Sequence, residues 1–300
     1  MSAVTSVESE VSATRRLQGF VALTKPRIIE LLLVTTLPTM VVADRGLPAW
    51  TLMLATLVGG TLAAGGANAI NMVVDRDIDS VMRRTRNRPL VTGVVTPAQA
   101  LVFAIGLEIA AFVELWAAVN VLSAVLAVSA TLFYVFVYTL WLKRTSRQNI
   151  VIGGAAGAVP VLVGWAAVRN GVGWSPLVLF ALMFLWTPPH FWALAIRYRE
   201  DYRSVDVPMM PVVTSFKKTA SQILAYTVLV AAVSLVFAWT AGMGPLYWVS
   251  AAVLGGVFCA MAYRLWRSPS EAHAMKLFHW SITYVTLLFV AMAADQLIFH

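Results

Sequence analysis

The sequence predicts an all-α integral membrane protein, built as a bundle of nine transmembrane helices. Of its 300 residues, 60% are hydrophobic and only 12% are charged, whereas soluble domains carry about 25% charged residues. The mean hydropathy is +0.79, and the apolar residues gather in runs of about 20, the length that a helix needs to cross a bilayer. Lys and Arg lie almost entirely in alternate loops, as in chains that cross a membrane back and forth.

Nine apolar stretches are the candidate spans, and the first of them is short. Three prolines stand at or near span starts, where a missing N–H costs little; they are Pro97, Pro176 and Pro245. Pro160, Pro188 and Pro189 lie inside spans and predict kinks or broken helices. The expected spans are 28–43, 50–74, 99–118, 121–142, 149–168, 175–196, 219–241, 245–265 and 277–298.

The positive charges orient the bundle. All but two of the 22 Lys and Arg residues fall on the side of the N-terminus, and the exceptions are Arg45 and Arg169. Because positive residues concentrate in cytoplasmic loops, we expect a cytoplasmic N-terminus and a C-terminus outside. The net charge of +8 does not indicate nucleic-acid binding, since the basic residues lie in short loops rather than on one soluble face. Composition favours a bacterial plasma (inner) membrane.

One domain is expected, from residue 21 to residue 300, after a polar cytoplasmic tail at 1–20 that we expect to be disordered. Two longer polar loops, at about 75–98 and 197–218, follow the second and sixth spans. This spacing suggests a parallel duplication of a four-helix unit with a ninth helix added. The single cysteine, Cys259, lies in an apolar run and excludes both an intrachain disulfide and a cysteine metal cluster.

The first polar loop carries the densest charge, in NMVVDRDIDSVMRRTRNRPL at 71–90. Asn71, Asp75 and Asp79 are four residues apart, so on a helix their side chains form one stripe. Oxygen ligands of this kind suit Mg²⁺, whose remaining ligands are often phosphate oxygens. Arginines downstream would neutralise those phosphates; they are Arg83, Arg84, Arg86 and Arg88. The alternative is a solvated loop in which Asp and Arg simply pair.

The second polar loop reads RYREDYRSVDVPMMPVV at 197–213. Asp201 is the preferred ligand, because the five-residue step to Asp206 does not align the two carboxylates on a helix. Two acidic loops on one side of the membrane would hold two Mg²⁺ around a diphosphate, in a cavity that opens to the cytoplasm. Metal and Arg make diphosphate a good leaving group, which favours ionisation of an allylic diphosphate.

The chain resembles the UbiA-type intramembrane prenyltransferases, and within them the branch that modifies heme. The stripe segment carries the resemblance, together with LTKPRIIELLLVTTLP, KRTSRQNIVIGGAAGAVPVLVGWAA and WTPPHFWALAIRYREDYRSVDVPMMPVV. It covers nearly the whole chain from about residue 20. The resemblance implies a nine-helix bundle that transfers a farnesyl group, with Mg²⁺, from farnesyl diphosphate to a vinyl group of heme b. Water then adds, giving the hydroxyethylfarnesyl side chain of heme O.

The same resemblance assigns roles to residues. It gives Asn71, Asp75 and Asp79 the first metal and Asp201 the second, while the irregular step to Asp206 departs from the pattern. For the diphosphate, it gives Lys25, Arg83, Arg84 and Arg88, and we add Arg199 because it lies near Asp201 in the chain. Beyond the resemblance, the positions of His190, Trp186, Tyr198 and Tyr202 in and before the second loop make them candidates for heme or substrate, and His190 is a candidate iron ligand because imidazole is a usual one. The implied protein partners are a heme A synthase or terminal-oxidase assembly factors.

Two other functions stay open. One is a UbiA-type enzyme whose acceptor is an aromatic quinone precursor. The other is a cation-coupled transporter with Asp75, Asp79, Glu108 and Glu114 on its ion path, although transporters bind ions near the midplane and this stripe lies at a cytoplasmic end among arginines. For Glu108 and Glu114, burial in a neutral form or pairing with a neighbouring helix is the simpler interpretation.

Overall fold

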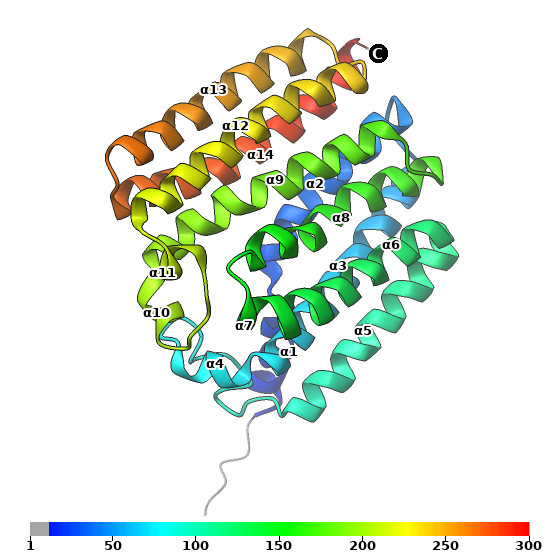
Figure 1. Ribbon diagram of the computed structural model, residues 1–300. Coiled ribbons are helices and arrows are strands. Elements are labelled where there is room, and N and C mark those ends of the chain that lie inside the picture. The colour runs from blue at the N-terminus through cyan, green and yellow to red at the C-terminus, as the bar shows by residue number, and fades with distance from the viewer. Residues whose placement is uncertain (1–11, 300) are drawn as a thin grey trace, which may run out of the picture.

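A computed structural model describes residues 12–299, without the side chains of 27–29 and 31–33. The described chain is helical throughout (Figure 1). The first half contains α1 (Ala13–Thr24), α2 (Pro26–Asp44), α3 (Trp50–Val74), α4 (Arg76–Val81), α5 (Pro97–Ala118), α6 (Val121–Leu132), the π-helix η1 (Phe133–Leu142) and α7 (Lys143–Thr145). The second half contains α8 (Asn149–Arg169), α9 (Trp174–Arg197), α10 (Arg199–Arg203), α11 (Met210–Val213), α12 (Phe216–Thr240), α13 (Pro245–Arg267) and α14 (Glu271–Phe299).

Eight helices of the described chain are long and apolar enough to cross a membrane, and they match the second to ninth predicted spans. In these eight, α6, η1 and α7 run on as one span, Val121–Thr145. Helix α2 lies where the first span is expected. The all-α membrane fold is therefore confirmed, while the count of nine spans and their orientation stay predictions.

Prolines inside the spans do not break them. Pro160 lies inside α8, and Pro188 and Pro189 lie inside α9, yet both helices run on as single elements. Of the predicted kinks or breaks, the breaks are therefore wrong, and the kinks stay a prediction. Next to the double proline, the Thr187 hydroxyl donates to the Met183 carbonyl at 3.0 Å. This bond is an extra one to the Met183 carbonyl, since the carbonyls that Pro188 and Pro189 leave without a helical donor are those of Phe184 and Leu185.

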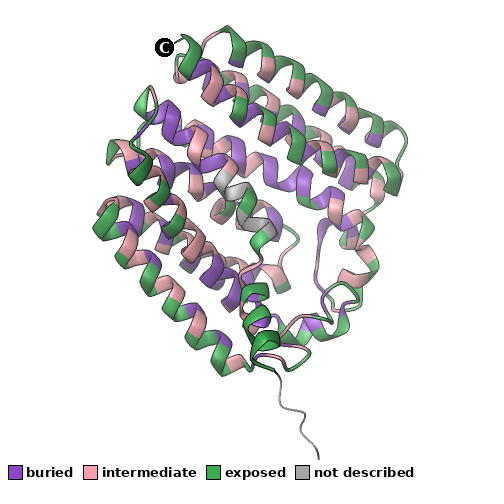
Figure 2. Ribbon diagram, turned by 180° about the vertical axis from the view of Figure 1, so that it is seen from behind, coloured by how far each residue is buried: buried purple, intermediate pink, exposed green. Residues whose placement is uncertain are grey.

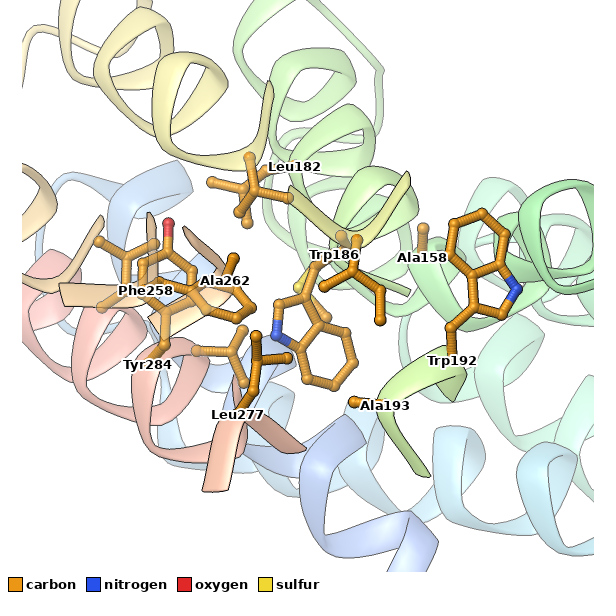
Figure 3. Close-up of a cluster of buried hydrophobic side chains, with 14 of the residues drawn as sticks. Ala158, Leu182, Trp186, Trp192, Ala193, Phe258, Ala262, Leu277 and Tyr284 are labelled. Atoms are coloured by element: carbon orange, nitrogen blue, oxygen red, sulfur yellow. The ribbon is translucent and has the colours of Figure 1, made fainter. Parts of the chain in front are cut away.

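The long helices run roughly side by side, and the polar connections gather at one end (Figure 1). Helices α12, α13 and α14 form one flank, and α3, α5 and α6 lie toward the other. Buried residues concentrate along the helices between these flanks (Figure 2). There α9 packs against α8, α12 and α14, and its Trp186 and Leu182 are core residues (Figure 3). Because α4, α10 and α11 lie at the same end, the two polar loops face one another.

Helices α3 and α5 approach closely because glycines face large side chains. A Cβ at Gly59 would lie 2.3 Å from Glu114 Oε2, and one at Gly66 would lie 2.6 Å from Glu108 Oε1. Glu108 also accepts from the Thr131 hydroxyl at 3.2 Å, whereas the buried Glu114 Oε2 has no hydrogen-bond partner among the described residues. Of the two interpretations, pairing with a neighbouring helix holds for Glu108, whereas for Glu114 burial in a neutral form stays the prediction.

At the opposite end of the bundle, Asp295 of α14 is fully buried. Its carboxylate accepts from the backbone N–H groups of Gly244, at 2.5 Å, and Tyr247, at 2.9 Å. These groups lie at the start of α13, where a helix has donors without intrahelical partners. Asp295 therefore caps a helix other than its own and ties α13 to α14.

The N-terminal tail is more ordered than expected. Residues 13–24 form α1, whose buried residues are Gly19 and Leu23. The prediction of a disordered segment is therefore wrong from Ala13 to Phe20, and residues 1–11 lie outside the described part. The helix is followed by Lys25, which has a left-handed backbone with φ 52°.

Candidate active site

The first polar stripe begins on the last turn of α3 and continues into α4. Asp75 stands between the two helices, with φ −85° and ψ 4°. Its N–H donates to the Asn71 carbonyl, and its own carbonyl accepts from the Asp79 N–H, both at 2.9 Å. The four-residue hydrogen-bond spacing therefore survives the junction, and the three side chains stay on one face, as the sequence predicts.

The stripe is buried although it is polar. Asn71 is 4% exposed, Asp75 0% and Asp79 3%. The Asn71 amide donates to Asp75 Oδ2 at 2.8 Å and to the Thr139 hydroxyl at 3.2 Å. Buried carboxylates are costly unless they are paired. The alternative of a solvated loop with Asp–Arg pairs is therefore wrong about solvation for Asp75 and Asp79, while its pairing holds for Asp79, which binds Arg88.

Three basic side chains converge on this stripe. Lys143 Nζ lies 2.5 Å from Asp75 Oδ2, and Arg88 Nη1 lies 2.5 Å from Asp79 Oδ2. Lys25 Nζ donates to Asn71 Oδ1 at 3.0 Å. Burial lowers the pKa of the Lys25 ammonium to about 7, and the positive charges of Arg88 and Lys143 act in the same direction. An anionic partner beside Lys25 would therefore raise the pKa of its ammonium and favour the charged form.

Asp77 faces elsewhere, as expected. It is exposed, and Arg144 binds both of its carboxylate oxygens, at 2.6 and 2.7 Å. This hydrogen bonding lowers the pKa of Asp77 to about 2. Arg144 also donates to the Val74 carbonyl at 3.1 Å, so it fixes the end of α3 from outside the stripe.

The stripe has the chemistry of a magnesium site that relies on its substrate for further ligands. Asp75 Oδ1 is buried and has no hydrogen-bond partner among the described residues; Arg144 Nη2 lies 3.9 Å from it, beyond hydrogen-bond distance. No group of three His, Cys, Asp or Glu gathers in the described chain. Two carboxylates and an amide oxygen, with phosphate oxygens completing the shell, match how Mg²⁺ is usually held.

The second polar loop touches the first. The backbone N–H of Arg84 donates to Asp201 Oδ2 at 3.3 Å. The Arg84 guanidinium lies over the Tyr198 ring, 5.3 Å from its centroid, a cation–π distance. Burial raises the pKa of the neighbouring Tyr202, against the opposing effect of the Arg84 charge. Asp201, Tyr198, Tyr202 and Arg84 therefore form one cluster, at the same end of the bundle as the stripe (Figure 1).

Three predicted or weighed residues are not brought into this cluster. Arg199 is half-buried, and its Nε has no hydrogen-bond partner among the described residues. It lines a different pocket, with Phe216 and Glu271. Arg83 and Asp206 are both exposed. The structure thus separates Arg199 from the stripe, and it places no ion pair on Arg83 within the described residues.

His190 and Trp186 lie in α9 on the side of α14. His190 Nδ1 is 2.7 Å from the Ser281 hydroxyl, and Trp186 Nε1 donates to the Ser281 carbonyl at 2.9 Å. The two rings stack at 4.3 Å between centroids. Trp186 lies beside Leu277 of α14 in Figure 3.

Sequence reasoning missed Thr139 and Lys143 as site residues and gave Arg144 a topological role only. Thr139 belongs to η1, and Lys143 and Arg144 follow directly in α7. The Thr139 hydroxyl donates to the Tyr134 carbonyl five residues before it, in the π-helical spacing. π-Helical turns are frequent at functional sites. The available signal was the basic pair in KRT, at the end of a span predicted to be cytoplasmic. The positive-inside rule alone already explains a basic pair there.

Known proteins share this sequence and fold. The model of the UbiA prenyltransferase family matches residues 32–287. A protoheme IX farnesyltransferase of Parafrankia sp. is 54% identical over 289 residues, covering 95% of this chain and 92% of the relative. One of Streptomyces coelicolor is 51% identical, covering 93% and 91%.

Solved structures agree with the fold at lower identity. A digeranylgeranylglyceryl phosphate synthase matches with a TM-score of 0.77 at 18% identity, over 94% of this chain and 98% of that one. A UbiA homologue from Archaeoglobus fulgidus, bound to GPP and Mg²⁺, matches with a TM-score of 0.61 at 14% identity, over 91% and 99%.

Proposed function

This chain belongs to the UbiA prenyltransferase family, and from that premise we propose that it transfers a farnesyl group from farnesyl diphosphate to a vinyl group of heme b. The products are heme O and diphosphate. The names of relatives about half identical over nearly the full chain support the substrate pair. The observation that carries the reaction class is the contact between Arg84 and Asp201, which joins two acidic loops at one end of an apolar bundle.

Two magnesium ions are proposed, one on each acidic loop. Asn71, Asp75 and Asp79 would hold the first, and Asp201 would hold the second. The unsatisfied oxygen of Asp75 supports the first site, and the homologue bound to GPP and Mg²⁺ supports the pairing of metal with a prenyl diphosphate. When bound, Mg²⁺ supplies neutralisation of the charge that develops on the leaving diphosphate.

The chain's own cations share that task. Lys25, Lys143 and Arg88 converge on the stripe, where they would bind diphosphate oxygens and stabilise the leaving group. Arg84, held against Tyr198, would act from the second loop. Arg83 keeps the diphosphate role predicted for it, since no ion pair among the described residues occupies its guanidinium, whereas Arg199 is less well placed because it lines another pocket.

The bond changes then follow. The bond between farnesyl C1 and the diphosphate oxygen breaks, and the terminal vinyl carbon of heme b bonds to C1. The cation left on the inner vinyl carbon takes the oxygen of water, and a proton is released. Because water would also quench the farnesyl cation, the site must exclude it until the carbon–carbon bond has formed.

We also propose how the chain is oriented and which membrane holds it. We place the polar end in the cytoplasm and the chain in the plasma membrane, with α2 as the first of nine spans, because all but two of the Lys and Arg residues lie on that side. A heme A synthase or terminal-oxidase assembly factors would then take up the product.

One assay tests the acceptor. Purified protein is incubated with farnesyl diphosphate and Mg²⁺, together with either heme b or 4-hydroxybenzoate, and products are identified by mass. We expect the hydroxyethylfarnesyl adduct of heme, and we expect its loss with EDTA or in Asp75→Asn. Prenylated 4-hydroxybenzoate without a heme product would move the chain to the quinone branch, and no prenylated product at all would reject the proposal.

A further inference from the structure

His190 is held in an aromatic stack inside the bundle. Its ring lies 4.3 Å from that of Trp186 at 19°, and 4.7 Å from that of Phe278 at 30°. The residue is only 8% exposed. A phenyl ring would fill such a stack equally well, so packing alone does not explain an imidazole there.

The hydrogen bonds around Ser281 determine which nitrogen of His190 carries the proton. The Ser281 hydroxyl donates to the Phe278 carbonyl at 2.6 Å. A hydroxyl has a single proton to donate, so in its 2.7 Å contact with His190 Nδ1 the Ser281 oxygen accepts. Nδ1 therefore carries the hydrogen, and in the neutral ring Nε2 keeps a free lone pair.

No described residue donates a hydrogen bond to that lone pair. Nδ1 is the only atom of His190 in a described hydrogen bond, and its other neighbours are aromatic faces and edges. Nε2 is not among the buried polar atoms that lack a partner, so it keeps some accessible surface through which a ligand can reach it. An imidazole that donates through one nitrogen to a fixed acceptor and presents the other is the usual arrangement of a metal-ligating histidine.

We propose that His190 Nε2 is an axial ligand of the iron in the heme substrate, and that Ser281 positions it. This inference rests on the proposed function, because it takes heme as the acceptor. His190 lies seven residues before the end of α9 at Arg197, which is about 10 Å along the helix axis. The porphyrin would thus lie deeper in the bundle than the diphosphate, with its iron anchored while the farnesyl chain reaches a vinyl group.

Titration of the full-length protein with ferric heme b tests the ligand. We expect wild type to show the absorption and electron paramagnetic resonance of a histidine-bound iron. His190→Ala should lose that signature and bind heme about tenfold more weakly, and added imidazole should restore the spectrum. His273→Ala and His279→Ala are the matched controls and should behave as wild type.

Ser281 gives an independent test. Ser281→Ala removes the acceptor for Nδ1, so heme should bind about tenfold more weakly with an altered iron spectrum, whereas Ser281→Thr should restore both. Equal spectra and affinities in wild type, His190→Ala and Ser281→Ala would overturn the inference.

Folding is checked by magnesium-dependent binding of farnesyl diphosphate, which none of these variants should change. If His190→Ala fails that check, His190→Gln replaces it. The ferrous wild-type complex adds a readout that needs no variant: without an iron–imidazole vibration in its resonance Raman spectrum, the inference fails. If wild type binds heme through His190 but binds no farnesyl diphosphate, the proposed function fails and the heme site stands.

Discussion

The backbone N–H of Arg84 donates to Asp201 across 3.3 Å, and this hydrogen bond joins two loops that are 117 residues apart in the chain. The Arg84 side chain meanwhile lies over Tyr198. One residue therefore holds the second acidic loop with its backbone and with its side chain. A diphosphate bridged between the loops requires them to be this close.

Asp201→Asn should reduce farnesyl transfer about 100-fold, as removal of one group that stabilises transition-state charge commonly does. The amide keeps an oxygen for the Arg84 N–H, so the loop contact should survive. Asp206→Asn is the matched control, because Asp206 is exposed with a left-handed backbone that Asn also adopts. Steady-state rates at saturating Mg²⁺ distinguish the two, and equal rates would remove Asp201 from the site.

Lys143→Met should lower thermal stability in the absence of Mg²⁺. Breaking a buried ion pair costs about 3–5 kcal/mol, and Asp75 has no exposed surface with which to recover solvation. Added Mg²⁺ should raise the melting temperature of the variant more than that of wild type, because the ion neutralises the stranded carboxylate. Lys276→Met, at an exposed position in α14, is the control and should change neither value. An identical Mg²⁺ response in all three proteins would contradict the pairing.

Gly59→Ala should destabilise the contact between α3 and α5 by about 1–3 kcal/mol, the usual cost of overpacking. Its Cβ would lie 2.3 Å from Glu114 Oε2 and 2.4 Å from Leu115 Cγ. Gly60→Ala is the control, since nothing lies within 4 Å of its Cβ and Ala costs less entropy than Gly in a helix. In detergent, the melting temperature should therefore fall in Gly59→Ala and rise in Gly60→Ala.

Asp295→Ala should destabilise the protein by about 1–3 kcal/mol, because it leaves the buried N–H of Tyr247 and the partly buried N–H of Gly244 without acceptors. Asp295→Asn keeps one carbonyl oxygen and should cost less. The distance from the polar end of the bundle implies that farnesyl transfer below the melting temperature stays unchanged. A large loss of rate in a variant that remains folded would mean that this end of the bundle takes part in the reaction.

Local sequence patterns predicted the parts of the molecule that depend on local physics. A membrane fixes the length of a span, so hydropathy located helices such as α3 and α9 to within a few residues. The helical repeat alone places Asn71, Asp75 and Asp79 on one face, and the four-residue hydrogen-bond spacing continues through Asp75.

Contacts between residues far apart in the chain could not be predicted from the sequence. Lys143 meets Asp75 from 68 residues away, and no local pattern encodes that meeting. Arg199 was assigned to the diphosphate because it lies near Asp201, but α9 ends at Arg197 and α10 begins anew after Tyr198. The direction of Arg199 is therefore set by a helix junction that hydropathy does not resolve.

Helix α1 sets a limit on how the protein can be shortened or tagged. Gly19 lies so close to the loop before α5 that a Cβ there would be 2.9 Å from both Val94 and Val95, and Lys25 follows at the end of the same helix. A deletion that stops before Ser12, whose side chain caps α1, leaves this contact intact. A deletion into α1 would uncover the two valines and release Lys25. An expression tag therefore belongs ahead of the helix, and the boundary suggested by polarity alone, at residue 20, would cut through it.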